Sequence, residues 1–214
     1  MKKVYVIYGD YCHPLETAIK SLENIFDNDE IIFTSTGNEI PWDNMENEVK
    51  LYISFKSDNT TLNPKTGVDY FITPERERAL YNYVANGGKA LFVHAGLVGY
   101  PLDSLYHKVA GGVFLIHPPE KNITYIPVNK EHPILDGVNA FTVYDEKYTC
   151  QIDNDVEVLM VGADDEYAGT ISAWCKNLGK GKSVSFAPGH SLLVANDENY
   201  LKFIKNAVNW LINR

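Results

Sequence analysis

The sequence predicts an α/β fold in which a mostly parallel, doubly wound sheet carries helices on both faces. Three continuous apolar runs, 4–8, 49–55 and 90–93, have the character of strands that are buried on both faces. Helical segments lie between them, and this alternation favours parallel strands joined by helical crossovers. Ligands of such sheets bind outside the carboxyl ends of the strands, so the loops that follow these runs form the expected site.

The first helix is expected after Pro14, because a polar loop ends there and apolar residues then recur at helical spacing. Its expected buried face comprises Leu15, Ile19, Leu22 and Phe26. A second strand is predicted at 31–33, which completes a first strand–helix–strand unit.

The second helix has a clear start at Thr73-Pro74-Glu75. Thr73 can accept hydrogen bonds from free backbone N–H groups, Pro74 suits the first helical position, and Glu75 complements the helix dipole. The helix is expected to end at Gly87-Gly88. The preceding segment, 56–73, is polar and rich in turn residues, which predicts a surface loop.

The region 111–155 is rich in proline and glycine, and we interpret it as an irregular, partly antiparallel insertion. Strand character returns afterwards, with a hairpin turn expected at 179–182. A last helix is predicted from about Glu198, and the whole chain, 1–214, is interpreted as one domain. Further strands are expected at 124–128, 141–144, 156–161, 170–174 and 183–186.

Composition excludes several classes of partner. The formal net charge is −9, so the surface should repel nucleic acid and anionic membranes. No segment approaches the ~20 apolar residues of a membrane span. The three cysteines, Cys12, Cys150 and Cys175, form no CxxC pair, which argues against a disulfide framework and favours a reducing compartment. A cytoplasmic location is therefore expected.

Four segments resemble the ThuA-like, or trehalose-utilisation, family of the class I glutamine amidotransferase-like fold. They are 73–96, His132-Pro133-Ile134 with Gly137, Asp145-Glu146-Lys147-Tyr148, and Trp174 followed by Gly179-Lys180-Gly181 and Gly189-His190. The resemblance implies a flavodoxin-like core and a role in bacterial sugar metabolism, with a trehalose-like or oxidised sugar as substrate. It attaches no single reaction to the chain, and the loop 54–69 is this sequence's own.

The resemblance also places a sharp strand-to-helix turn at His94-Ala95-Gly96-Leu97, where amidotransferases present a cysteine nucleophile. Ala95 and Gly96 have no nucleophilic atom, so thioester catalysis and glutaminase activity are excluded at this turn. Their backbone N–H groups are predicted to bind a substrate oxygen.

His94, Glu146 and His190 are the predicted catalytic residues. His94 and His190 each follow a predicted strand, where α/β folds place chemistry, although either ring could instead anchor its own loop. Asp145 and Glu146 are adjacent and should point in opposite directions, so Glu146 is assigned acid–base work and Asp145 a local hydrogen bond. Tyr148 should share the face of Glu146 and bind substrate hydroxyls.

Asp10 and His13 lie in the first loop and are predicted to bind substrate, with His117 as a weaker candidate. Cys12 is an alternative nucleophile if His13 lowers the pKa of its thiol. The remaining candidates are assigned structural positions: Trp174 in the core, His132 as a structural residue, and His107 on the surface.

No cofactor is certain from the sequence. His13, His94, His190 and a carboxylate would suit zinc or another divalent metal by ligand type, but each would come from a different loop. The sequence contains no GxGxxG or GxxxxGK[ST] motif, which argues against a nucleotide cofactor.

The leading hypothesis is a sugar-active enzyme that uses His/Glu acid–base chemistry without a cysteine nucleophile. The alternative is a non-catalytic sugar-binding or assembly module that has lost its enzyme function. The expected partner is a small-molecule sugar, and the sequence leaves open whether the chain forms a homo-oligomer.

Overall fold

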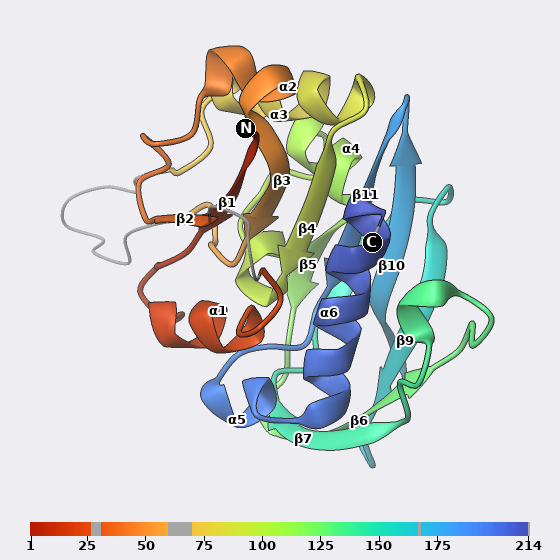
Figure 1. The fold of residues 1–214 in the computed structure, drawn as a ribbon. Coiled ribbons are helices and arrows are strands. Elements are labelled where there is room, and N and C mark those ends of the chain that lie inside the picture. The colour runs from red at the N-terminus through yellow and green to blue at the C-terminus, as the bar shows by residue number, and fades with distance from the viewer. Residues whose placement is uncertain (27–30, 60–69, 167, 214) are drawn as a thin grey trace, which may run out of the picture.

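A nine-stranded sheet with the strand order β2-β1-β3-β4-β11-β10-β9-β6-β7 runs through the molecule (Figure 1). The computed structural model describes residues 1–26, 31–59, 70–166 and 168–213. The strands of this sheet are β1 Lys3–Ile7, β2 Ile31–Thr34, β3 Val49–Ser54, β4 Lys89–Val93, β6 Lys121–Pro127, β7 Phe141–Asp145, β9 Glu157–Ala163, β10 Thr170–Leu178 and β11 Gly181–Phe186.

The sheet changes character at β11. Strands β2, β1, β3, β4 and β11 are parallel, whereas β10, β9, β6 and β7 continue the sheet with antiparallel pairs. The mostly parallel sheet with added antiparallel strands confirms the predicted fold class. The expected insertion therefore extends the main sheet, and only β5 (Gly112–Ile116) and β8 (Thr149–Ile152) pair separately.

Helices cover both faces of the sheet (Figure 1). Alternate residues of β1 face opposite cores: Val4 and Val6 pack on the side of α1 and α6, and Tyr5 and Ile7 on the side of α3 and α4. The longer helices are α1 Leu15–Ser21, α3 Pro74–Ala85, α4 Leu105–Ala110 and α6 Glu198–Ile212. The short ones are η1 Trp42–Asn44, α2 Met45–Glu48, η2 His94–Leu97, η3 Pro133–Leu135 and α5 Leu192–Ala195.

Several local predictions are confirmed. The Thr73 hydroxyl accepts a hydrogen bond from the Arg76 N–H at the start of α3, and Pro74 is the first helical residue. Strands β10 and β11 form the predicted hairpin. Helix α6 buries Ile204, Val208 and Leu211 on one stripe, as its spacing predicts.

The predicted buried face of α1 is confirmed in part. Leu22 is buried and Phe26 packs against the same core, but Ile19 is 48% exposed, and the helix ends at Ser21. Ala18 and Ser21 are buried in its place, and the Ser21 hydroxyl lies 2.9 Å from the Tyr200 hydroxyl of α6.

The predicted surface position of His107 is also wrong. The side chain is buried, its Nδ1 contacts the Leu102 carbonyl, and its Nε2 lies 3.1 Å from an Asp153 oxygen. Asp153 follows β8, which pairs with β5, so this two-stranded sheet covers the side of α4 that carries His107. The sequence of α4 alone looks polar.

Only part of the loop between β3 and α3 can be described. Lys56, Ser57 and Asp58 are buried rather than exposed, while residues 60–69 lie outside the described residues. Along the described stretches of the chain, no helix combines the length and apolarity needed to cross a membrane.

Candidate active site

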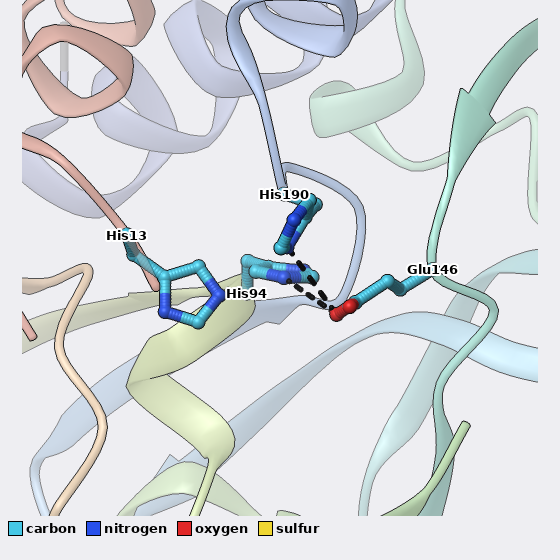
Figure 2. Close-up of side chains that lie close together, drawn as sticks. All are labelled: His13, His94, Glu146 and His190. Atoms are coloured by element: carbon cyan, nitrogen blue, oxygen red, sulfur yellow. Dashed lines mark ion pairs between the residues drawn. The ribbon is translucent and has the colours of Figure 1, made fainter. Parts of the chain in front are cut away.

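Four side chains from four distant segments meet at the carboxyl edge of the parallel strands (Figure 2). His13 follows β1, His94 follows β4, Glu146 follows β7, and His190 follows β11. Each of them offers one nitrogen or oxygen atom that lies within 4.8 Å of the corresponding atoms of the other three. We call these four residues the histidine cluster. Strand ends predicted the three histidines at this edge, and the resemblance to the family predicted Glu146. The structure brings all four together, and their chemical roles stay predictions.

The turn after β4 presents an imidazole rather than a small residue. His94 has φ +46°, a conformation that is restricted for side chains with a Cβ. At Gly96 a Cβ would collide with the Ser54 carbonyl oxygen, so only glycine permits this close packing. Ala95 and Gly96, whose N–H groups are predicted to bind a substrate oxygen, are both buried. Whether their N–H groups bind substrate stays a prediction.

The protonation of His94 follows from its partners. Its Nδ1 lies 2.7 Å from the Ala187 carbonyl oxygen, which can only accept, so Nδ1 carries the proton. In the neutral ring Nε2 has a lone pair, to which the Tyr148 hydroxyl can donate over 2.8 Å. The Tyr148 ring also stacks on the His94 imidazole, with the two ring centroids 4.3 Å apart. Tyr148 thus lies on the side of Glu146, as the spacing predicts.

Asp10 orients His13. One carboxylate oxygen lies 2.7 Å from His13 Nδ1 and accepts the Cys12 N–H, and the other accepts the Ser57 N–H. Burial alone would raise the pKa of Asp10, but His13 and these N–H groups outweigh it and lower that pKa to about 2. Burial lowers the pKa of His13 and favours the neutral ring. Its Nε2 is buried and has no hydrogen-bond partner among the described residues.

Glu146 lies between the other residues of the histidine cluster and His117. One carboxylate oxygen lies 3.4 Å from His94 Nε2 and 3.4 Å from His190 Nδ1, and the other lies 3.5 Å from His117 Nε2. Burial opposes ionisation of Glu146, yet His190 and His94 outweigh burial and lower its pKa. The neighbouring Glu146 carboxylate in turn raises the pKa of His190. His117 is one-third exposed, which places this predicted substrate contact at the entrance.

Asp145 points away from Glu146, as alternation predicts. It is fully buried and accepts hydrogen bonds from the Gly189 and His190 N–H groups, both at 3.1 Å, and from the Tyr125 hydroxyl at 3.0 Å. The local hydrogen bond predicted for Asp145 is therefore a long-range one. It fixes the backbone that carries His190.

Sequence reasoning missed two residues around the cluster. Glu120 lies 3.7 Å from His190 Nε2, on the side of the ring that faces away from Glu146. Lys147 is buried and forms an ion pair of 2.5 Å with Asp164. No motif marks Glu120, but the alternation that separates Asp145 from Glu146 also predicts that Lys147 points away from the site.

Cys12 does not fit the role of an activated nucleophile. Burial, Asp10 and Glu146 raise the pKa of its thiol, whereas a reactive cysteine needs a lowered one. Trp174 is fully buried and donates to the Ala110 carbonyl, which confirms its core position.

A second group, His132, Glu157 and Cys175, also lies close enough together to suggest a metal. His132 Nδ1 accepts the Ile134 N–H, so the proton of the neutral ring sits on Nε2, the atom that faces Cys175. That tautomer does not suit a metal ligand. His132 is structural, as predicted.

In the histidine cluster, by contrast, the tautomers of the rings suit metal ligands. In their neutral forms His13 and His94 both have an unprotonated Nε2, because Asp10 and the Ala187 carbonyl hold the protons on the opposite nitrogen atoms. The Tyr148 hydroxyl, which lies 2.8 Å from His94 Nε2, would have to turn away from that nitrogen when a metal binds. His190 presents Nδ1 to the cluster and Nε2 to Glu120. Each imidazole therefore has an oxygen acceptor behind it, which is the arrangement that orients histidine ligands in metal sites. The residues present fit a divalent metal.

A hollow of about 680 Å³ opens beside α2 and α3, away from the site, with no residue of the histidine cluster in its lining. A much smaller pocket, of about 10 Å³, touches His13, His94 and Gly189. It has room for about one water molecule.

Solved structures share the fold: a ThuA-like protein from Bacteroides uniformis ATCC 8492 (18% identity, TM-score 0.75, 99% of this chain and 92% of that chain) and one from Parabacteroides merdae ATCC 43184 (13%, 0.77, 99% and 90%). A beta-galactosidase from Rahnella sp. R3 matches with 13% identity and TM-score 0.69 over all of this chain but only 31% of its own.

Among curated proteins, none matches this sequence. A family profile described as trehalose utilisation matches residues 3–211, which is almost the whole chain. This chain therefore belongs to the trehalose-utilisation, or ThuA, family, and the family description implies a role in sugar utilisation.

Proposed function

We propose that this protein is a sugar-active enzyme that transforms a trehalose-like or oxidised glycoside by acid–base chemistry at a divalent metal. No cysteine intermediate takes part. One observation supports this most strongly. Three imidazoles from separate loops, those of His13, His94 and His190, each place one ring nitrogen near a common point beside Glu146. Membership of the trehalose-utilisation family supports the substrate class.

His13, His94 and His190 would hold the metal. Three histidines with an open position are typical of catalytic zinc sites, and imidazole also suits other divalent transition metals. When bound, the metal polarises a substrate oxygen or lowers the pKa of a bound water. In this proposal His94 and His190 bind the metal and do not transfer protons. Proton transfer would need the same two atoms, His94 Nε2 and His190 Nδ1, that would bind the metal.

Glu146 is the proposed general base. Its carboxylate lies between the three imidazoles and His117 at the mouth, where an incoming sugar would stand. With an oxidised sugar it would remove a proton beside the carbonyl group. Tyr148 is the proposed donor: burial raises the pKa of its phenol, so the hydroxyl stays protonated and can donate to a substrate oxygen. Asp10 and His117 position their partners, and the N–H groups of Ala95 and Gly96 remain proposed substrate contacts.

Removal of one imidazole should weaken metal binding strongly. We expect His94→Ala to weaken Zn²⁺ affinity by at least about tenfold. Loss of a residue that only hydrogen-bonds to a metal ligand already costs about tenfold to a hundredfold, and His94 is a proposed ligand itself. Isothermal titration of metal-free protein with Zn²⁺, and the visible spectrum with Co²⁺, measure the effect.

His132→Ala is the matched control, because His132 belongs to the second group and its tautomer does not suit a metal. It should leave the affinity unchanged. Equal affinity of His94→Ala and the unaltered protein would contradict the metal proposal.

Metal affinity should rise with pH. Metal-free His190 holds its proton more tightly than an ordinary histidine, because the Glu146 carboxylate raises its pKa. A ligand must lose its proton before it binds, so the apparent affinity should increase as pH rises through the raised pKa of His190 and level off above it. Zn²⁺ titrations in buffers of different ionisation enthalpy measure the released proton. An affinity independent of pH through the neutral range would exclude His190 as a ligand.

Turnover decides between an enzyme and a binding module. Zn²⁺-loaded protein is incubated with trehalose or with its keto derivative, and the sugar signals are followed by NMR. The proposal expects conversion that stops when a chelator removes the metal. Binding of both sugars without conversion of either would instead favour the non-catalytic sugar-binding module.

A further inference from the structure

A polar groove is lined by residues of strands β6 and β7 and extends from the side of the histidine cluster. The two strands pair side by side at one end of the sheet (Figure 1). The volume of the groove is about 580 Å³, within the range of roughly 300–1,000 Å³ that is common for small-molecule sites. The hairpin forms one side and residues 163–166, which follow from β9, form the other. The groove has no role in the chemistry described so far.

Glu120 joins the groove to the cluster. It belongs to the lining of the groove, and its carboxylate lies 3.7 Å from His190 Nε2. The pairing of β6 with β7 explains this: Lys121 pairs with Asp145 at the open end of the hairpin, and Glu146 follows Asp145 directly. The groove therefore begins beside the reacting centre and runs along the hairpin away from it.

The floor of the groove carries the groups that bind sugars. Thr124 and Thr142 stand opposite each other, with their hydroxyl oxygens 2.9 Å apart, and Asn122 pairs with Tyr144 one step nearer the cluster. The hydroxyl and amide groups can hydrogen-bond to sugar hydroxyls. Tyr144 is 48% exposed and offers an aromatic ring against which the C–H face of a pyranose can pack.

Charge restricts the ligand further. Glu120, Asp165 and Glu166 all line the groove, and the cationic side chain in its described lining, Lys121, is paired with Glu166. A groove with this balance repels phosphorylated sugars and uronates. A neutral sugar meets no such barrier.

We propose that the groove is a second sugar subsite, so the substrate is a neutral glycoside with at least two units. One unit reaches the histidine cluster and the other lies on Tyr144, Thr124 and Thr142. This inference rests on the proposed function for the reacting unit and adds the recognition of the non-reacting one.

The test compares a disaccharide with its monosaccharide. Trehalose and glucose are titrated separately into ¹⁵N-labelled protein, and amide shifts report both position and affinity. Trehalose should shift the signals of β6 and β7 together with those of the cluster. Tyr144→Ala should weaken trehalose binding about tenfold, because the buried face of an aromatic ring contributes that order of affinity, and leave glucose binding unchanged.

Ile126→Ala is the control, since Ile126 is an exposed residue of the same strand that lies outside the groove. It should bind trehalose as the unaltered protein does. The double substitution Thr124→Val with Thr142→Val keeps the size of both side chains and should also weaken trehalose selectively.

The two proposals fail separately. Equal trehalose affinity of Tyr144→Ala and the unaltered protein, shifts confined to another surface, or no trehalose binding at all would overturn the subsite. Failure of Zn²⁺ to bind, with a selective trehalose defect in Tyr144→Ala, would overturn the metal proposal and leave the subsite standing. In turnover assays Tyr144→Ala should raise KM without lowering kcat.

Discussion

Glu146→Gln is expected to lower turnover by about 10²- to 10⁴-fold, the contribution that a positioned general base typically makes. The substitution keeps the size of the side chain and replaces the proton-accepting carboxylate with an amide. Zn²⁺ affinity should change little, because His13, His94 and His190 are the proposed ligands. Measurements of kcat and of Zn²⁺ affinity on the same preparation separate the two functions.

Glu131→Gln is the matched control for this change, since Glu131 is exposed and lies far along the chain from the cluster residues. It should keep both turnover and metal affinity. A Glu146→Gln variant that loses its metal together with turnover would make Glu146 a ligand rather than a base.

Asp145→Ala should destabilise the fold more than any change at the cluster itself. The substitution leaves the N–H groups of Gly189 and His190 and the Tyr125 hydroxyl without their buried acceptor. Each unpaired buried donor costs roughly 1–3 kcal/mol, so we expect a loss of about 3 kcal/mol or more in the free energy of unfolding. Urea denaturation followed by circular dichroism measures it.

Two comparisons test the cause of this loss. Asp136→Ala, at an exposed aspartate, should cost little. Asp145→Asn retains one acceptor oxygen and should fall between the two. If Asp145→Ala unfolds at the same urea concentration as the unaltered protein, the three hydrogen bonds do not support the loop that carries His190.

The strand ends of this fold were accessible from sequence because buried parallel strands read as continuous apolar runs. The ends of β1, β4 and β11 located His13, His94 and His190 in this way. Glu146 needed more, because it follows an antiparallel strand, and its assignment depended on the resemblance to the family.

Other features escaped sequence analysis for physical reasons. The contact of the Ser21 hydroxyl of α1 with the Tyr200 hydroxyl joins two helices that are far apart in the sequence, and no local pattern encodes it. His107 is covered by the segment around Asp153, which lies more than forty residues further along the chain. Glu120 acquires its place beside His190 only when β6 pairs with β7. In each case a contact between distant segments decides the outcome.

The place of β11 in the sheet has a consequence for biosynthesis. This strand is the last of the sheet to be translated, yet it lies between β4 and β10 in the interior of the sheet. A nascent chain therefore cannot close the sheet until β11 has left the ribosome, and pairing of such distant segments is slow. His190 arrives with the same segment, so the histidine cluster cannot assemble in an incomplete chain that is still emerging from the ribosome.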